Sequence, residues 1–154
     1  MPDLITINPK AKFFQTYYDG IAQLRQMGVK HEMGLRTAFI QLLGEAAKLF
    51  GWALVAEVTQ KTERGTIRPD AILYKNGLPR GYYEAKDTAD DLPTEILRKA
   101  QRGYPLTNII FEDSVHATLY QNGGHIRTVS IADRPAFIGL LTDFFGYTEP
   151  IIEK

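Results

Sequence analysis

The segment 67–87, IRPDAILYKNGLPRGYYEAKD, constrains the fold of this chain more than any other stretch. Two apolar runs flank Asn76-Gly77, a dipeptide that favours the tight turn of a two-residue β-hairpin because both residues tolerate positive φ. We therefore expect two antiparallel strands. Asp70 begins the first strand, while Glu84 and Lys86 lie near the end of the second. Antiparallel pairing should bring these three charged groups together at one end of a sheet.

Two helical segments precede the hairpin. Apolar residues recur at helical spacing in NPKAKFFQTYYDGIAQLRQMG, where Asn8 is a suitable N-cap and Pro9 suits the first turn. A second apolar stripe runs through HEMGLRTAFIQLLGEAAKLFG, and Gly51 favours the end of that helix. We expect both helices to pack one face against a common core.

Beyond Trp52 the pattern becomes that of strands. WALVAEVTQ predicts a strand, KTERGTIR a polar connection, LPTEILRKAQRGYP a short helix and the segment 106–131 three strands turning at Asn122-Gly123-Gly124. A closing helix should be capped by Asp133 and end at Gly146. The order αα-βββ-α-βββ-α indicates an α/β (α+β) fold with a mixed central sheet flanked by helices.

Composition excludes several classes of function. The 154 residues include no cysteine, which excludes disulfides, thiolate metal sites and cysteine nucleophiles and suits a reducing, cytoplasmic location. With 18 basic and 18 acidic residues, the net charge gives no general attraction to polyanions. No apolar run is long enough for a membrane span, so no membrane association is expected.

The charges of the hairpin indicate a site for a divalent cation. Asp70 and Glu84 should repel one another unless a positive charge lies between them. Carboxylate oxygens suit Mg²⁺ or Mn²⁺, and the carbonyl of Ala85 offers another oxygen. Lys86 could then hold a water molecule and offset negative charge during phosphodiester hydrolysis. The alternative is an exposed, ion-paired face of the hairpin with no chemical role.

These residues resemble the signature of PD-(D/E)xK nucleases, with Pro69-Asp70 followed by Glu84-Ala85-Lys86. The αβββαβ core of that superfamily corresponds to the order predicted from the second helix onward. HEMGLRTAFIQLL is similar to the TEHTYRPAL-x-x-LL opening of the N-terminal endonuclease domains of type ISP and type IIG restriction-modification enzymes. KAQRGYPLTNIIFEDSVHATLYQNG is similar to a downstream stretch of the same domains.

The resemblance implies a role for each residue of the signature. Asp70 and Glu84 would bind the metal, and Glu32 would complete its shell or hold a metal-bound water. Lys86 would position and polarise the attacking water, and the products would be a 5′-phosphate and a 3′-hydroxyl. An acidic residue at a helix start such as Glu32 also favours the helix dipole without any further role.

Other residues become candidates for DNA contacts. The resemblance places Arg36 one turn after Glu32, and Gln101, Arg102 and Tyr104 on the helix after the catalytic strand. The family often has Arg directly before the Tyr of this helix, whereas here Gly103 precedes Tyr104. The basic loop residues could bind phosphates or remain solvated. They are Lys61, Arg64 and Arg68.

We therefore expect one domain over 1–154, with an N-terminal helix in 1–30, a nuclease core in 31–146 and a tail in 147–154. The expected activity is Mg²⁺- or Mn²⁺-dependent endonucleolytic hydrolysis of DNA, as the cleavage module of a restriction-modification enzyme. Its partners would be methyltransferase and specificity domains, with a homodimer as one way to cut both strands. The alternatives are a resolvase-like repair or recombination nuclease and a non-catalytic DNA-binding or scaffold domain of the same fold.

Overall fold

The computed structural model describes residues 6–29, 32–86 and 91–148, without the side chains of residues 32 and 33. Four helices and eight strands lie within these ranges. The helices are α1 (Lys12–Gln26), α2 (Glu32–Leu49), α3 (Leu92–Gln101) and α4 (Arg134–Phe145). The strands are β1 (Ala53–Ala56), β2 (Gln60–Thr62), β3 (Gly65–Ile67), β4 (Ala71–Lys75), β5 (Leu78–Ala85), β6 (Asn108–Glu112), β7 (His116–Gln121) and β8 (Gly124–Ser130).

Six strands form the central sheet, in the order β1-β4-β5-β6-β7-β8. All neighbouring pairs are antiparallel except β5 and β6, which run parallel. A parallel pair needs a crossover connection, and α3 lies in the segment that connects β5 to β6. The mixed α/β architecture predicted from the sequence is therefore confirmed.

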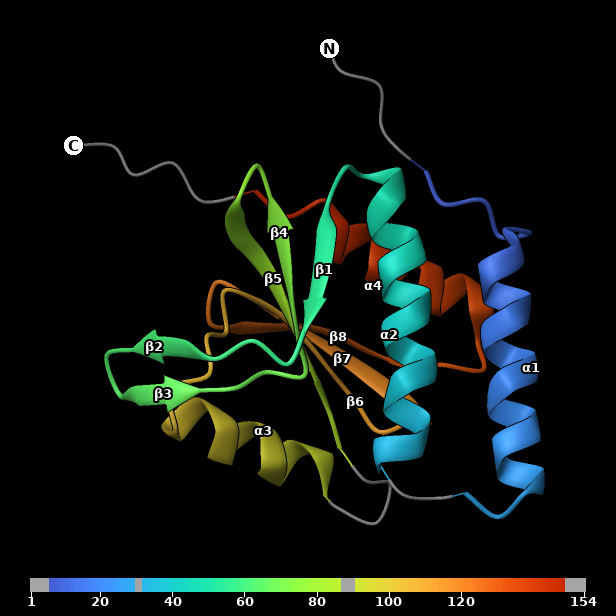
Figure 1. Cartoon of the computed structure of the whole chain (residues 1–154), viewed down its shortest axis with the longest axis horizontal. Coiled ribbons are helices and arrows are strands. Elements are labelled where there is room, and N and C mark those ends of the chain that lie inside the picture. Colours follow the sequence, from blue (N-terminus) through green and yellow to red (C-terminus); the bar gives the residue numbers. More distant parts are fainter. Residues whose placement is uncertain (1–5, 30–31, 87–90, 149–154) are drawn as a thin grey trace.

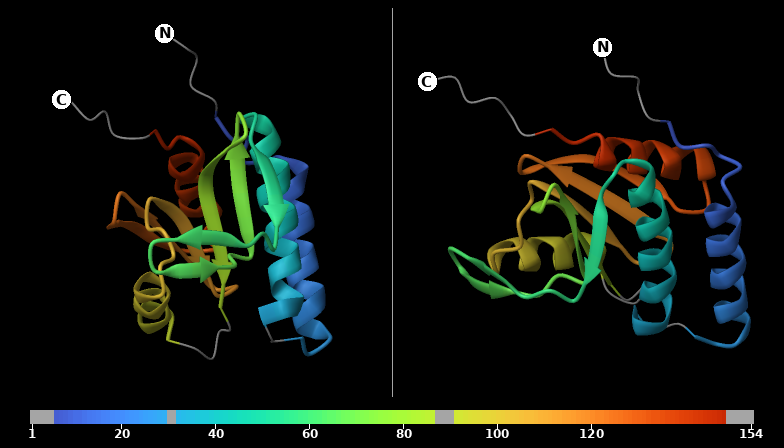
Figure 2. Two further views of the ribbon diagram at one scale, coloured as in Figure 1. Left: turned by 60° about the vertical axis from the view of Figure 1, so that its left-hand side comes forward. Right: turned by 45° about the horizontal axis from the view of Figure 1, so that its top comes forward.

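The sheet is covered on both faces, as the three views of Figures 1 and 2 show. Helices α1, α2 and α4 cover one face, where Phe14, Phe39 and Phe137 are fully buried against strand residues such as Tyr83. Helix α3 covers the other face through Leu92 and Ile96, which belong to a smaller cluster. The order is thus helix, sheet, helix, and α3 alone supplies the helical part of the smaller cluster within the described ranges.

Both Asn-Gly turns form as the sequence predicts. Asn76 and Gly77 have φ of 53° and 77°, and Asn122 and Gly123 have φ of 52° and 82°. Positive φ at both central positions is what a type I′ hairpin turn requires. The first turn pairs Lys75 with Leu78, and a bulge between Leu73 and Tyr74 then shifts the register by one residue. Ala71 therefore pairs with Tyr83, which sets Asp70 beside the end of β5.

The segment after β1 differs from its sequence prediction. A strand was expected to continue to Gln60, followed by a polar connection, but the chain turns away at Glu57, whose φ is 58°. Strands β2 and β3 then pair only with one another and form an arm beside the sheet (Figure 1). Polar side chains do not prevent this pairing, because backbone hydrogen bonds join the two strands and Ile67 packs into the smaller cluster.

The first helix also begins later than predicted. Asn8 does not cap α1, because its side-chain oxygen accepts a hydrogen bond from Lys10 N at 2.9 Å and forms a turn before the helix. Helix α1 begins at Lys12. The closing helix follows its prediction, with the Asp133 side chain accepting from Ala136 N and Gly146 at its C-cap. Within the described ranges, no helix is both long enough and apolar enough to cross a membrane.

Candidate active site

Asp70 lies directly before β4 and is held in place by two hydrogen bonds. Its Oδ2 accepts from the backbone N of Ala85 on β5 at 2.8 Å, and its Oδ1 accepts from Nη1 of Arg36 on α2 at 2.8 Å. The residue is only 7% exposed. Because a carboxylate has about four lone-pair positions, each oxygen of Asp70 can still accept another ligand.

Glu84 lies on β5 beside Asp70 and is 4% exposed. Burial, followed by the negative charge of Asp70, raises the pKa of Glu84 to about 8. Its Oε2 is buried without a hydrogen-bond partner among the described residues. Buried polar atoms are rarely left unpaired, because the loss of hydration is not compensated. This oxygen therefore marks a place where a cation or a donor fits.

Two lysines surround this carboxylate pair, and only one of them belongs to the signature. Lys86 follows β5, and its Nζ lies 3.7 Å from Oε2 of Glu95 on α3. Lys99, also on α3, places its Nζ 3.8 Å from Oε1 of Glu84. Both lysine side chains are 12% exposed. The site thus contains three carboxylates and two ammonium groups at one end of the sheet.

Tyr104 supports the site from the segment after α3. It is 7% exposed, and its hydroxyl donates to the carbonyl of Arg68 at 3.2 Å. The Lys99 ammonium lies 4.6 Å from the centre of the Tyr104 ring and 3.4 Å from its hydroxyl. Burial, followed by the negative charge of Glu84, raises the pKa of Tyr104. The phenol therefore stays protonated and fixes the position of Lys99.

Arg36, predicted as a DNA contact, forms an ion pair with Asp70 and so contacts the site itself. Besides Asp70, its guanidinium approaches Oε1 of Glu57 at 3.5 Å. Glu57 also lies 3.5 Å from Arg68, and its backbone N donates to the carbonyl of Asp70 at 3.0 Å. Helix α2, the exit from β1 and the start of β4 are thus joined by one network around Asp70.

The predicted metal ligands are only partly described. Glu32 is the first residue of α2, but its side chain lies outside the described part of the chain. Ala85 ends β5 beside Glu84. Among the described residues, no three carboxylate or imidazole side chains come together in a group that could hold a metal ion. Asp70 and Glu84, with the unpartnered Oε2, nevertheless form a donor pair of the kind that hard divalent cations prefer.

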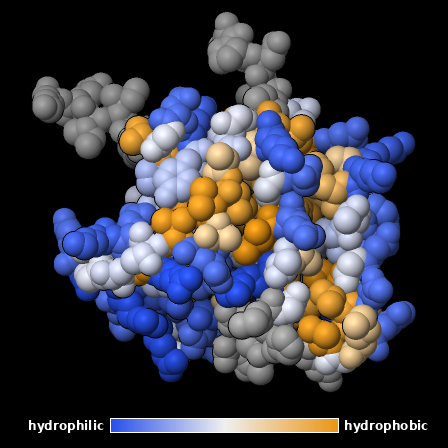
Figure 3. Space-filling view, in the orientation of Figure 1, coloured by the Kyte–Doolittle hydropathy of each residue, from blue (hydrophilic) through white to orange (hydrophobic). Residues whose placement is uncertain are grey.

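The predicted DNA contacts flank this cluster. Lys61, Arg64 and Arg68 lie on or beside the β2–β3 arm and are exposed. The arm rests against the end of α3, because Arg64 Nη1 donates to the carbonyl of Gln101 at 3.3 Å. The side chains of Gln101 and Arg102 are exposed. Figure 3 shows hydrophilic side chains gathered over the arm and α3.

Sequence reasoning missed Lys99 and Glu95. A signal for Lys99 exists, because it continues the spacing of the buried residues Leu92 and Ile96 on the face of α3 that packs on the sheet. A lysine at a core-facing position indicates a charged partner below it. Glu95 lies one turn before Lys99, so the two can act together.

A different buried carboxylate, Glu112, lies at the end of β6, paired with Ala85 of β5. Its side chain packs on the face covered by α1 and α2, where it accepts hydrogen bonds from the Tyr83 hydroxyl and from Ser114 N at 2.6 Å. Burial raises the pKa of Glu112 to about 7, although these two hydrogen bonds lower it. Both oxygens of Glu112 therefore have protein donors.

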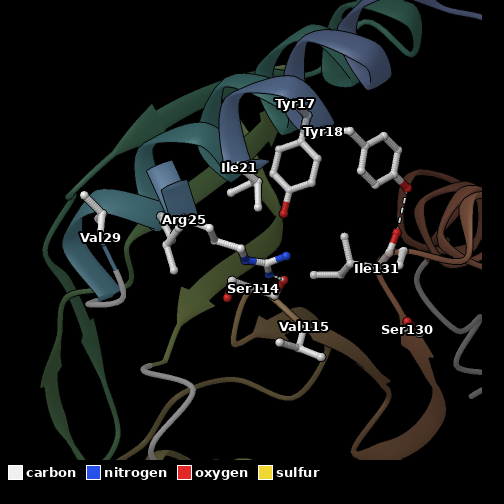
Figure 4. Close-up of a pocket in the computed structure, with 11 residues that line it drawn as sticks. Tyr17, Tyr18, Ile21, Arg25, Val29, Ser114, Val115, Ser130 and Ile131 are labelled. Atoms are coloured by element: carbon white, nitrogen blue, oxygen red, sulfur yellow. Dashed lines mark hydrogen bonds between the residues drawn. The ribbon is translucent and has the colours of Figure 1, made fainter. Parts of the chain in front are cut away.

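A cavity of about 420 Å³ lies near Glu112, between α1 and the β7–β8 side of the sheet (Figure 4). The Tyr17 hydroxyl points into it and has no hydrogen-bond partner among the described residues. Arg25 reaches across to the carbonyl of Ser114 at 2.9 Å. The other lining residues named in Figure 4 are mainly apolar. Among the described side chains, no carboxylate lines the cavity, so paired acidic groups like those of the Asp70–Glu84 cluster are not seen there.

Among the comparisons with known proteins, the one with solved structures found a similar fold. No protein-family model matches the sequence, and no curated protein matches it. The chain is similar to DrdV, solved by cryo-electron microscopy as a complex with DNA, at 40% identity and a TM-score of 0.86. That match covers 90% of this chain and 14% of the DrdV chain.

A second match is a DUF820 protein from Anabaena variabilis ATCC 29413, described as a nuclease candidate. It has 10% identity and a TM-score of 0.46, over 66% of this chain and 78% of that one. The extensive match to DrdV, together with the six-stranded mixed sheet between helices, identifies the architecture expected from the sequence signature. This chain has a restriction-endonuclease-like nuclease fold.

Proposed function

We propose that this chain is a divalent-metal-dependent endonuclease domain that hydrolyses phosphodiester bonds of DNA. One observation carries the proposal: Asp70 and Glu84 are buried side by side at the ends of adjacent strands, and one oxygen of Glu84 has no partner among the described residues. A structural ion pair would satisfy both carboxylates, whereas a cation-binding pair keeps oxygens available. The fold and the match to a DNA-bound protein support the same conclusion.

Asp70 and Glu84 would hold Mg²⁺ or Mn²⁺, with the Ala85 carbonyl and Glu32 as further oxygen ligands. The ion would supply Lewis-acid stabilisation of charge on the phosphate and a lowered pKa for a bound water. Arg36 keeps Asp70 oriented by its 2.8 Å hydrogen bond. Second contacts of this kind fix the direction in which a ligand's free lone pairs point.

Lys86 would position the attacking water and offset the charge that develops on the phosphate. Its ammonium lies in the same cluster as Glu84 and Glu95, and it is largely shielded from solvent. A shielded charge acts more strongly on a reacting group than an exposed one, because water screens it less. This role requires the positive charge of Lys86 itself, not merely its contact with α3.

The DNA backbone would lie along the arm and α3. The exposed basic side chains there suit phosphate contacts, which hold the duplex without reading its sequence. They belong to Lys61, Arg64, Arg68 and Arg102. The side chain of Gln101 adds a polar group beside them. DNA as a partner is supported by the DrdV match, whose structure contains DNA.

We further propose that this domain is the cleavage module of a restriction-modification enzyme. The chain spans 14% of the length of DrdV, so most of that protein has no counterpart here. Methyltransferase and specificity domains, in the same or a partner polypeptide, would supply DNA affinity. The net charge of zero agrees with this division, because phosphate contacts provide most non-specific binding and require an excess of basic residues.

Plasmid cleavage tests the activity. The chain is incubated with supercoiled DNA and Mg²⁺ or Mn²⁺, and EDTA should stop the reaction. Lys86→Ala should cut about 10²–10³-fold more slowly. The control is Lys75→Ala, which removes an exposed lysine at the end of β4. Equal cutting by Lys86→Ala and the control would contradict the catalytic role.

Metal binding tests the site independently of cutting. Mn²⁺ bound to the chain can be measured from the electron paramagnetic resonance signal of the free ion. The wild type should bind Mn²⁺ saturably, and Asp70→Asn should bind it far more weakly, because one of the anionic ligands is lost. If Asp70→Asn binds Mn²⁺ as the wild type does, Asp70 is not a ligand and the site is wrong.

A further inference from the structure

Helix α3 brings a charged pair to the site that the nuclease signature does not include. Lys99 lies 3.8 Å from Glu84, and Glu95 lies 3.7 Å from Lys86. Each charged side chain at the end of β5 thus faces an opposite charge on the same helix. The helix supplies one acid and one base one turn apart, so it pairs with both charged residues at the end of β5.

Both contacts are loose. A charge-assisted hydrogen bond between an ammonium and a carboxylate measures roughly 2.7–2.9 Å, about 1 Å shorter than either pair here. The ammonium of Lys99 therefore favours the charged form of Glu84 through space without taking up its lone pairs. Oε2 of Glu84 remains without a partner among the described residues. Lone pairs that are kept free in this way remain available to a stronger cation.

The place of Lys99 is set by more than its contact with Glu84. Its ammonium also lies 4.6 Å from the centre of the Tyr104 ring. The ring face attracts a cation, and the fixed phenol keeps the lysine within the site even when its contact with Glu84 is broken. Lys99 can thus change partners without moving into solvent.

This proposal rests on the metal-dependent function above. We propose that, when no divalent ion is bound, the ammonium of Lys99 occupies the position beside Glu84 that the ion would take. In the ion-free site its ammonium lies against Glu84; when the ion binds, it leaves Glu84 and faces the phosphate backbone of the DNA. Two cations cannot both lie against one buried carboxylate without repelling each other. Removing the charge of Lys99 therefore helps the ion to bind but weakens cleavage.

The experiment measures Mn²⁺ binding and plasmid cleavage in the same variants. Lys99→Gln should bind Mn²⁺ about three- to tenfold more tightly, the range expected for loss of one weak competing ion pair. It should cut about 10²-fold more slowly, because a charge near the phosphate is missing. Lys99→Arg keeps the charge and should bind Mn²⁺ no more tightly than the wild type.

Controls separate this proposal from the proposed function. Lys75→Gln, at an exposed position on β4, should change neither quantity. If the wild type binds Mn²⁺ saturably but Lys99→Gln binds it equally or more weakly, Lys99 does not compete with the ion and the inference fails alone. If the wild type binds no Mn²⁺, the metal site and the inference fail together.

A stability measurement covers the case in which Lys99→Gln folds poorly. Without the Lys99 ammonium, Glu84 loses the positive charge 3.8 Å from it, so the thermal midpoint in EDTA should fall below that of the wild type. Saturating Mn²⁺ should remove most of this difference, because the ion replaces the missing charge. An equal deficit with and without Mn²⁺ would show that Lys99 is merely structural and would overturn the proposal.

Discussion

Glu84 and Glu112 are buried glutamates on neighbouring strands, yet their surroundings differ. Glu112 accepts hydrogen bonds at both oxygens, from Tyr83 and Ser114, on the face covered by α1 and α2. Glu84 faces α3, has an unpartnered oxygen among the described residues and lies beside another carboxylate. Burial alone therefore does not distinguish an acid proposed to bind a metal ion from one that the protein itself satisfies. The distinction lies in whether the protein itself satisfies the carboxylate.

The sharpest test of this difference is cleavage by Glu84→Gln and Glu112→Gln. Glu84→Gln should lose at least about 10²–10³-fold in cutting rate, as expected when a group that stabilises the transition state is removed. Glu112→Gln should retain most of the activity of its folded fraction. Plasmid cleavage in Mg²⁺, scaled to folded protein measured by circular dichroism, checks both. Similar losses of cutting rate in the two variants would show that Glu84 and Glu112 do not differ in their importance for cleavage.

Stability should change in the opposite sense. Glu112→Gln removes a hydrogen-bonded carboxylate and should lower the free energy of unfolding by about 1–3 kcal/mol. Glu84→Gln should leave that free energy unchanged or raise it, because it removes the repulsion from Asp70. Urea denaturation of both variants in EDTA measures the difference. A marked loss of stability in Glu84→Gln would mean that Glu84 helps to hold the fold.

The pH dependence separates the two acids by range. The pKa values of Glu84 and Glu112 are raised from 4.5 to about 8 and about 7. The folded chain then binds more protons than the unfolded chain, so unfolding free energy falls as pH rises from 4.5 through these values. Without metal, Glu84→Gln should flatten the fall between pH 7 and 8. Glu112→Gln should flatten it only below about pH 7; urea midpoints across this range provide the check.

The smallest expected effect concerns the two faces of the molecule. Lys61 is exposed on the arm, near the Glu84 side, whereas Lys48 is exposed on α2. Lys61→Gln should weaken DNA binding and reduce the slope of log affinity against log salt by about 1, the loss of one phosphate contact. Lys48→Gln should change neither. Fluorescence anisotropy with a labelled duplex in EDTA measures both quantities. Equal slopes of log affinity against log salt for Lys61→Gln and the wild type would show that Lys61 on the arm does not contact the DNA.

The fold and half of the site could be predicted from local sequence. Asn76-Gly77 fixes the turn of the hairpin and so brings Asp70 to the end of β5. The bulge between Leu73 and Tyr74, which shifts the register by one residue and sets Asp70 beside Glu84, has no such local signal. Lys99 and Glu95 could not be placed in this way, because their contacts depend on how α3 rotates and docks on the sheet. The arm was missed for a related reason: its strands are three residues long and Ile67 is their one buried residue, so no periodic pattern marks them.

The backbone of Glu57 has a consequence for how the domain works. It adopts a left-handed conformation where the chain leaves β1 for the arm, and its N–H donates to the carbonyl of Asp70. A displacement of the arm would therefore shift the backbone of Asp70, the residue proposed to hold the ion. Any such coupling is reciprocal: if DNA on the arm tightens ion binding by some factor, the ion tightens DNA binding by the same factor. Through Glu57, DNA bound to the arm would then strengthen ion binding at Asp70, and without DNA the ion would bind more weakly.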